Sequence, residues 1–318
     1  MKFDRVLVPE IILGKRGMPQ AIEFYKMMLK DVCPEVTDGK IGVRVPSDFM
    51  NMMDANTIEH ILVSKIFRDK GNKTYYLSND FSVALSKLDR EIPVNHLPKE
   101  FVGYFILGSG ALKDESGSVD GGFVYIGPGD ALGLSFVDGT PRTETVLSIN
   151  YFNTSLYEGG IGEIYRFNYS LKDLEAVKLG DFLKANADLS KDSVLTDLGL
   201  EQKVTDPADL ATRAPVLRAL VNAVLYAASD EPEVCKLLPL SSYSNKKRVE
   251  VKKTVPAQNL CTIPIIMLNH TYKEGITYSV GSTVVQAHLR WQRCGPQLSK
   301  VKLIWVKEHE RHYDDGQN

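Results

Sequence analysis

The sequence predicts an α+β protein, in which a helical N-terminal segment precedes an antiparallel sheet, apolar helices and a C-terminal β-hairpin module. Three observations support this fold class. Apolar residues in segment 1–100 recur at helical spacing. From Phe101 onward, short apolar or alternating runs are separated by Gly-, Asp- and Ser-rich turns. Near the C-terminus, two alternating runs flank a Gly-Pro turn, the pattern of a half-buried hairpin.

The N-terminal segment contains three predicted helices. The first spans Pro19 to Lys30, because proline suits the first turn and apolar residues follow at helical spacing. The second begins at Asn56 or Thr57 and has its apolar residues on one face. The third is capped by Asp80. A short strand is expected between the second and third helices, at Lys73 to Leu77.

Five short runs predict the antiparallel sheet. Asp114 to Gly122 is predicted to be a flexible loop, because Gly, Ser and Asp favour turns. The five predicted strands are Phe101 to Leu107, Gly122 to Ile126, Ala131 to Val137, Thr145 to Phe152, and Ile164 to Tyr169.

Helical spacing returns in the second half of the chain. It predicts helices at Ser170 to Ala187 and at Leu210 to Ala228, the latter with a strongly apolar face. Asn245 to Lys253 is a polar, basic connection, and Cys261 to Leu268 reads as a buried strand. The length suggests two domains, which we place at residues 1–190, a helix-plus-sheet body, and 191–318, a ligand-binding module.

The C-terminal module is centred on Val284 to Lys307, which holds both tryptophans of the chain. In the first predicted strand, Leu289 and Trp291 alternate with polar residues, and the turn follows at Gly295-Pro296. In the second, Val301, Leu303 and Trp305 lie on one face, while Lys300 and Lys302 fall on the other. One face can therefore pack on a core, while the other presents cationic and hydrogen-bonding side chains: His288, Arg290, Gln292, Lys300 and Lys302.

The net charge of −2 hides an uneven distribution. Residues 241–318 carry 12 Lys or Arg against 6 Asp or Glu, whereas the rest of the chain has an excess of eight acidic residues. An acidic body with a basic C-terminal segment favours an anionic or polar partner at that end. A basic face that is merely solvated explains the same count equally well.

Several classes of site find no support in the sequence. The four cysteines form no C-x-x-C pair, and the Gly-rich stretches complete neither a dinucleotide fingerprint nor a P-loop. His309 and His312 could bind a metal if helical, but a solvated tail is the simpler reading. We therefore expect no metal and no cofactor. Without a secretory segment or an apolar run of about 18 residues, a cytoplasmic protein is expected, with no membrane partner.

The hairpin residues also resemble a known family. His288, Trp291, Gln292, Gly295 and Trp305 follow a His-x-x-Trp-Gln motif, a glycine turn and a basic-aliphatic strand ending in Trp. This pattern is similar to the C-terminal signature of a type V-A anti-CRISPR family of phages and plasmids, although the second arm here is one residue longer. Leu225 to Pro239 resembles a second family segment, an apolar helix leading into Glu-Pro and Leu-Pro. The resemblance covers mainly the last third of the chain.

This resemblance implies an anti-defence function in the host cytoplasm. Members of the family recognise the N-terminal segment of a CRISPR effector nuclease during its synthesis, and the encoding mRNA is then lost. The implied partner is the nascent polypeptide of a defence protein, with the ribosome or mRNA as further partners. The first arm has fewer aromatic and histidine side chains than the family pattern, which leaves the identity of the target open.

Two other readings remain open. The basic face suits RNA phosphates and stacked bases as well as a peptide, so the chain could be a ribonuclease acting on mRNA at the ribosome. A structural or virion protein without a ligand is the third reading. Because spacing supports no catalytic constellation, we expect no intrinsic enzyme activity. In the leading hypothesis Arg290, Lys300 and Lys302 act electrostatically, His288 and Gln292 form hydrogen bonds, and Trp291 and Trp305 support the hairpin.

Overall fold

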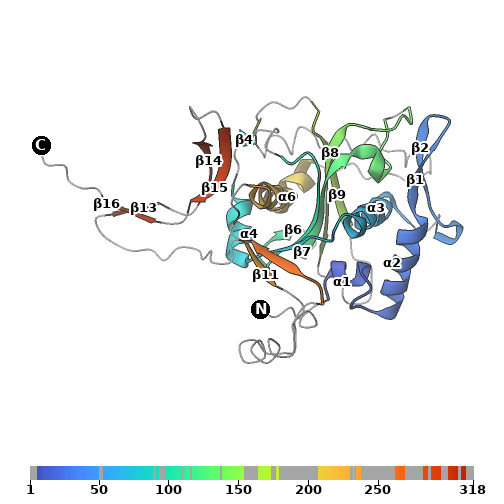
Figure 1. Cartoon of the computed structure of the whole chain (residues 1–318), viewed down its shortest axis with the longest axis horizontal. Helices are drawn as coiled ribbons and strands as arrows, with labels where there is room; N and C mark the ends of the chain where they lie inside the picture. Colours follow the sequence, from blue (N-terminus) through green and yellow to red (C-terminus); the bar gives the residue numbers. More distant parts are fainter. Residues whose placement is uncertain are drawn as a thin grey trace, which may run out of the picture.

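In the part of the chain that the structure describes, a mixed β-sheet separates two helical layers (Figure 1). The α+β class is therefore confirmed. The computed structural model describes residues 6–49, 53–88, 91–92, 97–108, 110–114, 117–136, 138–153, 164–172, 177–178, 207–229, 232, 234–237, 262–268, 282–285, 288–294, 300–306 and 309–312.

The helices are α1 (Val8–Ile12), α2 (Pro19–Asp31), α3 (Ala55–Asp69), α4 (Asn79–Ser86) and α6 (Pro207–Ala227). The large sheet contains β3 (Thr74–Leu77), β5 (Phe101–Ile106), β6 (Lys113–Asp114), β7 (Gly117–Pro128), β8 (Thr145–Asn153), β9 (Ile164–Ser170), β11 (Val234–Leu237) and β12 (Ile265–Leu268). Four pairs stand apart from it: β1 (Cys33–Thr37) with β2 (Lys40–Arg44), β4 (Glu91–Ile92) with β10 (Val177–Lys178), β13 (Ser282–Val285) with β16 (His309–His312), and β14 (His288–Cys294) with β15 (Lys300–Val306).

The large sheet is mixed: the predicted strands β5, β7, β8 and β9 pair antiparallel, as expected, whereas β3 adds parallel neighbours that the sequence did not predict. Its strands follow the order β11-β12-β3-β5-β7-β8-β9, with β6 beside β7. The strand β3 runs parallel to both β12 and β5, and the remaining pairs are antiparallel. The parallel pair β3–β5 arises because α4 connects these strands as a crossover helix, which local alternation in the sequence does not reveal.

One face of the sheet is covered by α3, with α2 outside it (Figure 1). The helix α3 begins after Asp54, whose side chain accepts a hydrogen bond from the Thr57 amide at 2.7 Å. Its apolar residues pack against aromatic rings from β5, β7 and β8. Two cations of α3 then hold α2, because Lys65 and Arg68 donate to carbonyl oxygens near its C-terminal end, at 3.1 and 3.5 Å.

The other face is covered by α6 and α4 (Figure 1). The residues that formed the predicted apolar face of α6 are all fully buried or nearly so, among them Val216, Leu220 and Val224. Buried Asn222 fastens α6 to the end of α4, since its amide donates to the carbonyls of Leu85 at 2.9 Å and Leu88 at 3.1 Å. Because α6 also contacts β15, this helix links the sheet to the strand pair β14–β15.

A buried carboxylate connects the N-terminal segment to the strand β12. Glu10 is fully buried in α1, a short helix that the sequence did not predict. One carboxylate oxygen accepts a hydrogen bond from the Leu7 amide at 3.0 Å. The other accepts from the amide and the hydroxyl of Thr262, both at 2.8 Å. This contact joins two segments that lie 252 residues apart and places β12 beside α1.

Three local predictions are wrong. Asp114 to Gly122 is not a loop, because β6 ends at Asp114 and β7 begins at Gly117. In the predicted strand from Ala131 to Val137, the described residues 131–136 form no strand; they begin in a 3-10 turn (Gly129–Leu132) that closes at Gly133 with a positive φ of 71°. The helix expected from Ser170 to Ala187 is contradicted where it is described, because β9 runs through Ser170 and β10 contains Val177. The basic connection at Asn245 to Lys253 lies outside the described residues.

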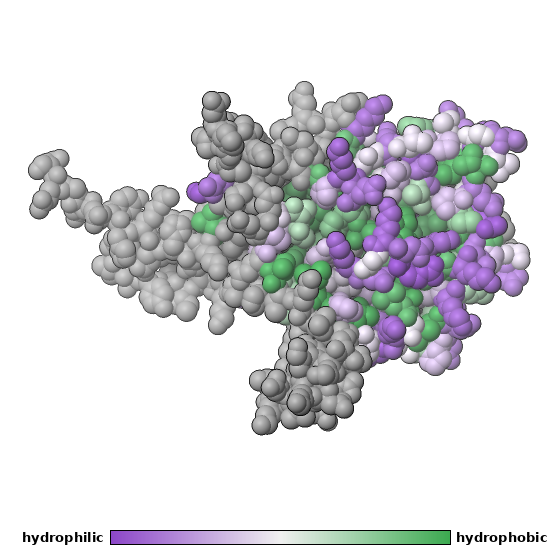
Figure 2. Space-filling view, in the orientation of Figure 1, coloured by the Kyte–Doolittle hydropathy of each residue, from purple (hydrophilic) through white to green (hydrophobic). Residues whose placement is uncertain are grey.

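The described surface is polar over most of the face shown in Figure 2, where hydrophobic residues gather in small patches between polar ones. No helix among the described residues is long and apolar enough to span a bilayer. The proposed division at residue 190 remains a prediction. Strands from both sides of that position, β3 and β12, pair within the same sheet.

We predict that Asn222→Ala destabilises the protein by about 1–3 kcal/mol, because two buried carbonyl groups lose their donor. The higher helix propensity of alanine offsets a small part of this effect. Urea denaturation followed by circular dichroism measures the change. Gln20→Ala, at an exposed position of α2, is the control and is expected to change stability by less than about 0.5 kcal/mol. Equal stability of both variants would contradict a fastening role for Asn222.

Candidate ligand-binding ribbon and a buried polar cluster

The predicted C-terminal hairpin strands exist, as β14 and β15. They pair antiparallel, with His288 opposite Val306, Gln292 opposite Lys302 and Cys294 opposite Lys300. We call this two-stranded sheet the ribbon. Among the described residues, no third strand pairs with it. The ribbon lies beside α6, which contacts β15 (Figure 1).

The first arm is shorter than predicted. The sequence suggested one continuous strand from Val284 to Gln292, but β13 ends at Val285 and β14 begins at His288. The two strands have different partners, since β13 pairs with β16 and β14 pairs with β15. His309 and His312 therefore belong to a strand rather than to a helix. An odd separation of three places them on opposite faces of that strand.

The register places five predicted ligand-binding residues on one face of the ribbon. Residues directly opposite each other in an antiparallel pair share a face, and alternate residues along a strand do so too. By this rule the first face carries His288, Arg290, Gln292, Lys300 and Lys302, together with Cys294, Ile304 and Val306. Leu289, Trp291, Arg293, Val301, Leu303 and Trp305 occupy positions on the second face.

The described side chains indicate which way the first face points. Arg290 is exposed and Gln292 is half-buried. The side chains of the other predicted ligand-binding residues lie outside the described set, so their roles stay predictions. An exposed guanidinium beside an unpaired strand edge offers a charge and main-chain hydrogen bonds to the same extended ligand.

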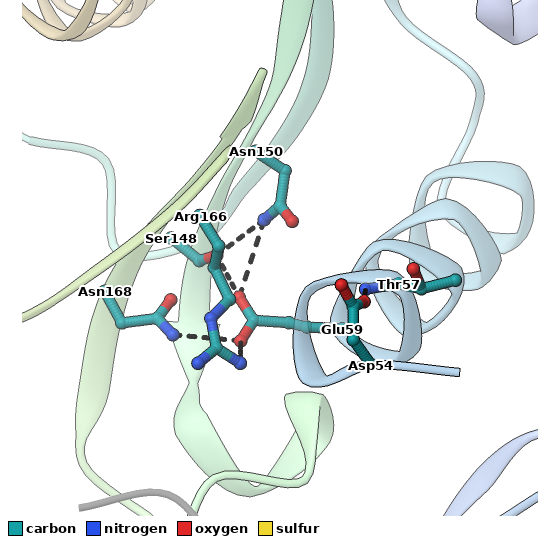
Figure 3. A network of polar contacts seen from close by, with 7 residues as sticks. All are labelled: Asp54, Thr57, Glu59, Ser148, Asn150, Arg166 and Asn168. Atoms are coloured by element: carbon teal, nitrogen blue, oxygen red, sulfur yellow. Dashed lines mark hydrogen bonds and ion pairs between the residues drawn. The ribbon is translucent and has the colours of Figure 1, made fainter. Parts of the chain in front are cut away.

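The structure also contains a buried polar cluster that sequence reasoning missed (Figure 3). Glu59 of α3 is only 2% exposed and points at β8 and β9. One carboxylate oxygen accepts from the Ser148 hydroxyl at 2.7 Å and more weakly from the Asn150 amide at 3.5 Å. The other accepts from Arg166 and from Asn168, both at 2.9 Å. We call these five residues the Glu59 cluster.

The Glu59 cluster has a structural rather than a ligand-binding geometry. The Arg166 guanidinium, 4% exposed, neutralises the carboxylate at 2.9 Å, and the neutral donors complete its hydrogen bonds. A charged pair that is closed off from solvent in this way fixes which residues of α3, β8 and β9 face each other. Polar residues at alternate positions in otherwise apolar strands, Ser148 with Asn150 and Arg166 with Asn168, were the available sequence signal.

Next to this cluster, His60 is buried among aromatic rings. Its Nε2 lies 2.6 Å from the Tyr25 hydroxyl, and the ring contacts Phe123 and Phe152 edge-on or tilted. Its Nδ1 has no hydrogen-bond partner. Burial lowers the pKa of His60 from 6.5 to about 3 and raises the pKa of Tyr25 above its usual range. The pair is therefore neutral at pH 7 and serves packing between α2, α3 and the sheet.

Comparisons with known proteins place the chain only loosely. No family model and no curated protein matches it. Among solved structures, the crystal structure of AcrVA2 aligns with a TM-score of 0.42 and 11% sequence identity, over 80% of this chain and 76% of that chain. A likeness this weak carries no argument for a shared mechanism, and the functional proposal below is built from the ribbon and the sequence.

We predict that Glu59→Gln destabilises the protein by about 3–5 kcal/mol, because it leaves the buried Arg166 without a counter-charge. Thermal and urea unfolding measure the change. Glu23→Gln is the matched control, since Glu23 is 73% exposed and its ion pair with Lys26 contributes at most about 0.5 kcal/mol. If both substitutions had the same small effect, the cluster would not hold α3 to the sheet.

The low pKa of His60 predicts a pH-dependent part of the stability. In the unfolded chain His60 binds a proton below pH 6.5, whereas the folded protein resists protonation down to about pH 3. Stability is therefore lost as the pH falls through this window, by at most about 1.4 kcal/mol per pH unit. Urea unfolding of wild type and His60→Gln between pH 7.5 and 4.5 isolates this contribution. The two stability curves should converge at low pH, and parallel curves would contradict the assignment.

Proposed function

We propose that this chain is an anti-defence protein of a phage or another mobile element, which binds a nascent polypeptide of a defence protein and triggers loss of its mRNA. The binding surface is the first face and the unpaired edge of the ribbon. One observation carries the binding proposal: the register brings His288, Arg290, Gln292, Lys300 and Lys302 onto one face, with Arg290 exposed. The anti-defence class rests on the sequence resemblance in the same ribbon.

An extended polypeptide suits this surface for a geometric reason. A two-stranded ribbon leaves main-chain donors and acceptors on its outer edges, and an added strand satisfies them in a regular ladder. Such pairing is largely independent of the ligand sequence, so selectivity must come from side chains. Cations two residues apart on one face match acidic or hydrogen-bonding side chains at alternate positions of the added strand.

The position of the ribbon favours ligand access. It stands beside α6 and projects from the side of the sheet opposite α2 (Figure 1). The basic C-terminal segment contrasts with the acidic remainder of the chain. Negative groups on a partner are thus attracted to the ribbon and repelled by the body, which raises the rate of productive encounters.

A ribonuclease is the second candidate, because the same cationic face suits RNA phosphates. The described residues contain no group of three or more His, Cys, Asp or Glu side chains that could hold a metal ion. Catalysis would then depend on side chains other than such a cluster, and the ribbon would hold the RNA.

We predict that Arg290→Glu combined with Lys302→Glu lowers recovery of nascent chains at least tenfold and leaves the unfolding midpoint nearly unchanged, because the first face loses its charge complementarity. The tagged full-length chain is recovered from translating cells, and the co-purifying nascent peptides and mRNAs are sequenced. Lys15→Glu with Lys40→Glu changes the net charge equally at exposed positions on the α1–β2 side of the body, and provides the control.

Undiminished recovery with the ribbon double variant would remove the ribbon from the binding site. The salt response separates the two candidate functions. RNA binding should weaken by about one log unit per log unit of salt for each phosphate neutralised, whereas main-chain pairing with a peptide should weaken far less. Cleavage of protein-free RNA by the purified chain would favour the ribonuclease.

A further inference from the structure

The edge strand β9 presents a row of unpaired main-chain groups. The Leu171 amide donates to the Thr145 carbonyl at 2.9 Å, in register with the β8–β9 pairing. Because main-chain groups alternate in direction along a strand, the odd-numbered residues of β9 bond to β8. Ile164, Arg166, Asn168 and Ser170 therefore direct their N–H and C=O groups away from β8. In the described part of the chain, no strand pairs with that side.

This edge lacks the usual protection against pairing. Proteins commonly block an edge strand by making it short or by placing lysine, proline or a bulge in it. The opposite edge of the sheet follows this pattern, because β11 has four residues and contains Lys236. In contrast, β9 has seven residues and contains neither lysine nor proline. Its single charge, Arg166, is turned inward and neutralised by Glu59 at 2.9 Å.

The sequence of β9 is nearly symmetric about its centre. It reads Ile-Tyr-Arg-Phe-Asn-Tyr-Ser, with Phe167 in the middle and Tyr165 and Tyr169 on either side. A two-fold axis through Phe167, perpendicular to the sheet, would set Ile164 opposite the partner's Ser170 and Arg166 opposite the partner's Asn168. All the outward N–H and C=O groups would then pair across the seam, and each face of β9 would meet the same face of its partner.

We propose that β9 is the seam of a symmetric dimer, in which it pairs antiparallel with β9 of a second copy of this chain. In this register Phe167 faces the partner's Phe167, and Tyr165 faces the partner's Tyr169, both of which are favourable cross-strand aromatic pairs. A shift by two residues in one direction sets Arg166 opposite the partner's Arg166. A shift in the other direction leaves outward groups at Ile164 unpaired. The register centred on Phe167 is therefore preferred.

The Glu59 cluster fixes the conformation of β9 before a second copy binds. Arg166 and Asn168 are each held by the Glu59 carboxylate at 2.9 Å, so the strand has one fixed register and twist before it meets a partner. Less conformational freedom is then lost on association. A seam of one strand per copy lies at the low end of interface sizes, so we expect a reversible dimer with a Kd of about 1–100 μM.

Sedimentation equilibrium of the full chain, from about 1 to 500 μM, tests the proposal across the expected Kd range. Ser170→Pro removes an outward N–H and places a ring in the seam, without removing a hydrogen bond to β8. It should weaken dimerisation at least tenfold. Ser170→Ala is the matched control: like proline, it loses the hydroxyl that accepts from the Lys172 amide, but it keeps the N–H. It should dimerise within about twofold of wild type.

Hydrogen exchange of the unmodified chain gives a second test that needs no variant. The amides of Arg166, Asn168 and Ser170 should become protected as concentration rises, while those of Tyr165, Phe167 and Tyr169 stay protected throughout. A monomer at every concentration, a dimer indifferent to Ser170→Pro, or concentration-dependent protection elsewhere would each overturn the proposal. These readouts do not involve the ribbon, so they are independent of the proposed peptide binding.

Discussion

The architecture depends on one buried ion pair at the side of the sheet, between Glu59 of α3 and Arg166 of β9. A carboxylate removed from water is strongly destabilising unless it is neutralised and fully hydrogen-bonded, and here Ser148, Asn150 and Asn168 complete that shell. Apolar packing alone would let an edge strand slide by two residues at little cost. Because the carboxylate accepts from residues on two adjacent strands, it selects one register for both of them and one position for α3.

Further elements pack on the two faces of the large sheet that contains this ion pair. On the α3 side, Lys65 and Arg68 hold α2, and Glu10 connects the N-terminal segment to Thr262. On the opposite side, α6 covers the sheet with its apolar face and contacts β15, which makes it the support for the candidate binding surface. The long-range polar contacts of the body are thus made by a small number of buried side chains within large apolar clusters.

Local sequence patterns predicted those elements whose cause is local. Helical spacing located α2, α3 and α6, and alternation located β5, β8, β9 and the two arms of the ribbon. The failures have non-local causes. Asp114 to Gly122 looked like a loop because of its glycines, yet a Cβ at Gly122 would lie 2.7 Å from the Asn150 carbonyl oxygen, so glycine is needed there for close strand approach. The parallel neighbours of β3 and the partners of Glu59 are distant in sequence, and no periodicity encodes them.

The ribbon and the edge of β9 both have main-chain groups that no described strand pairs with, and we propose that they bind different partners. Both offer a ladder of hydrogen bonds, but they differ in the charge that accompanies it. Arg166 points inward and is neutralised, so the edge of β9 is electrically neutral and suits a neutral, self-complementary strand. Arg290 is exposed on a face that also carries Lys300 and Lys302, so we expect the ribbon to repel a second ribbon and to attract an acidic chain. Because such interactions are screened beyond about 8–10 Å at physiological salt, we expect each edge to select its partner independently of the other.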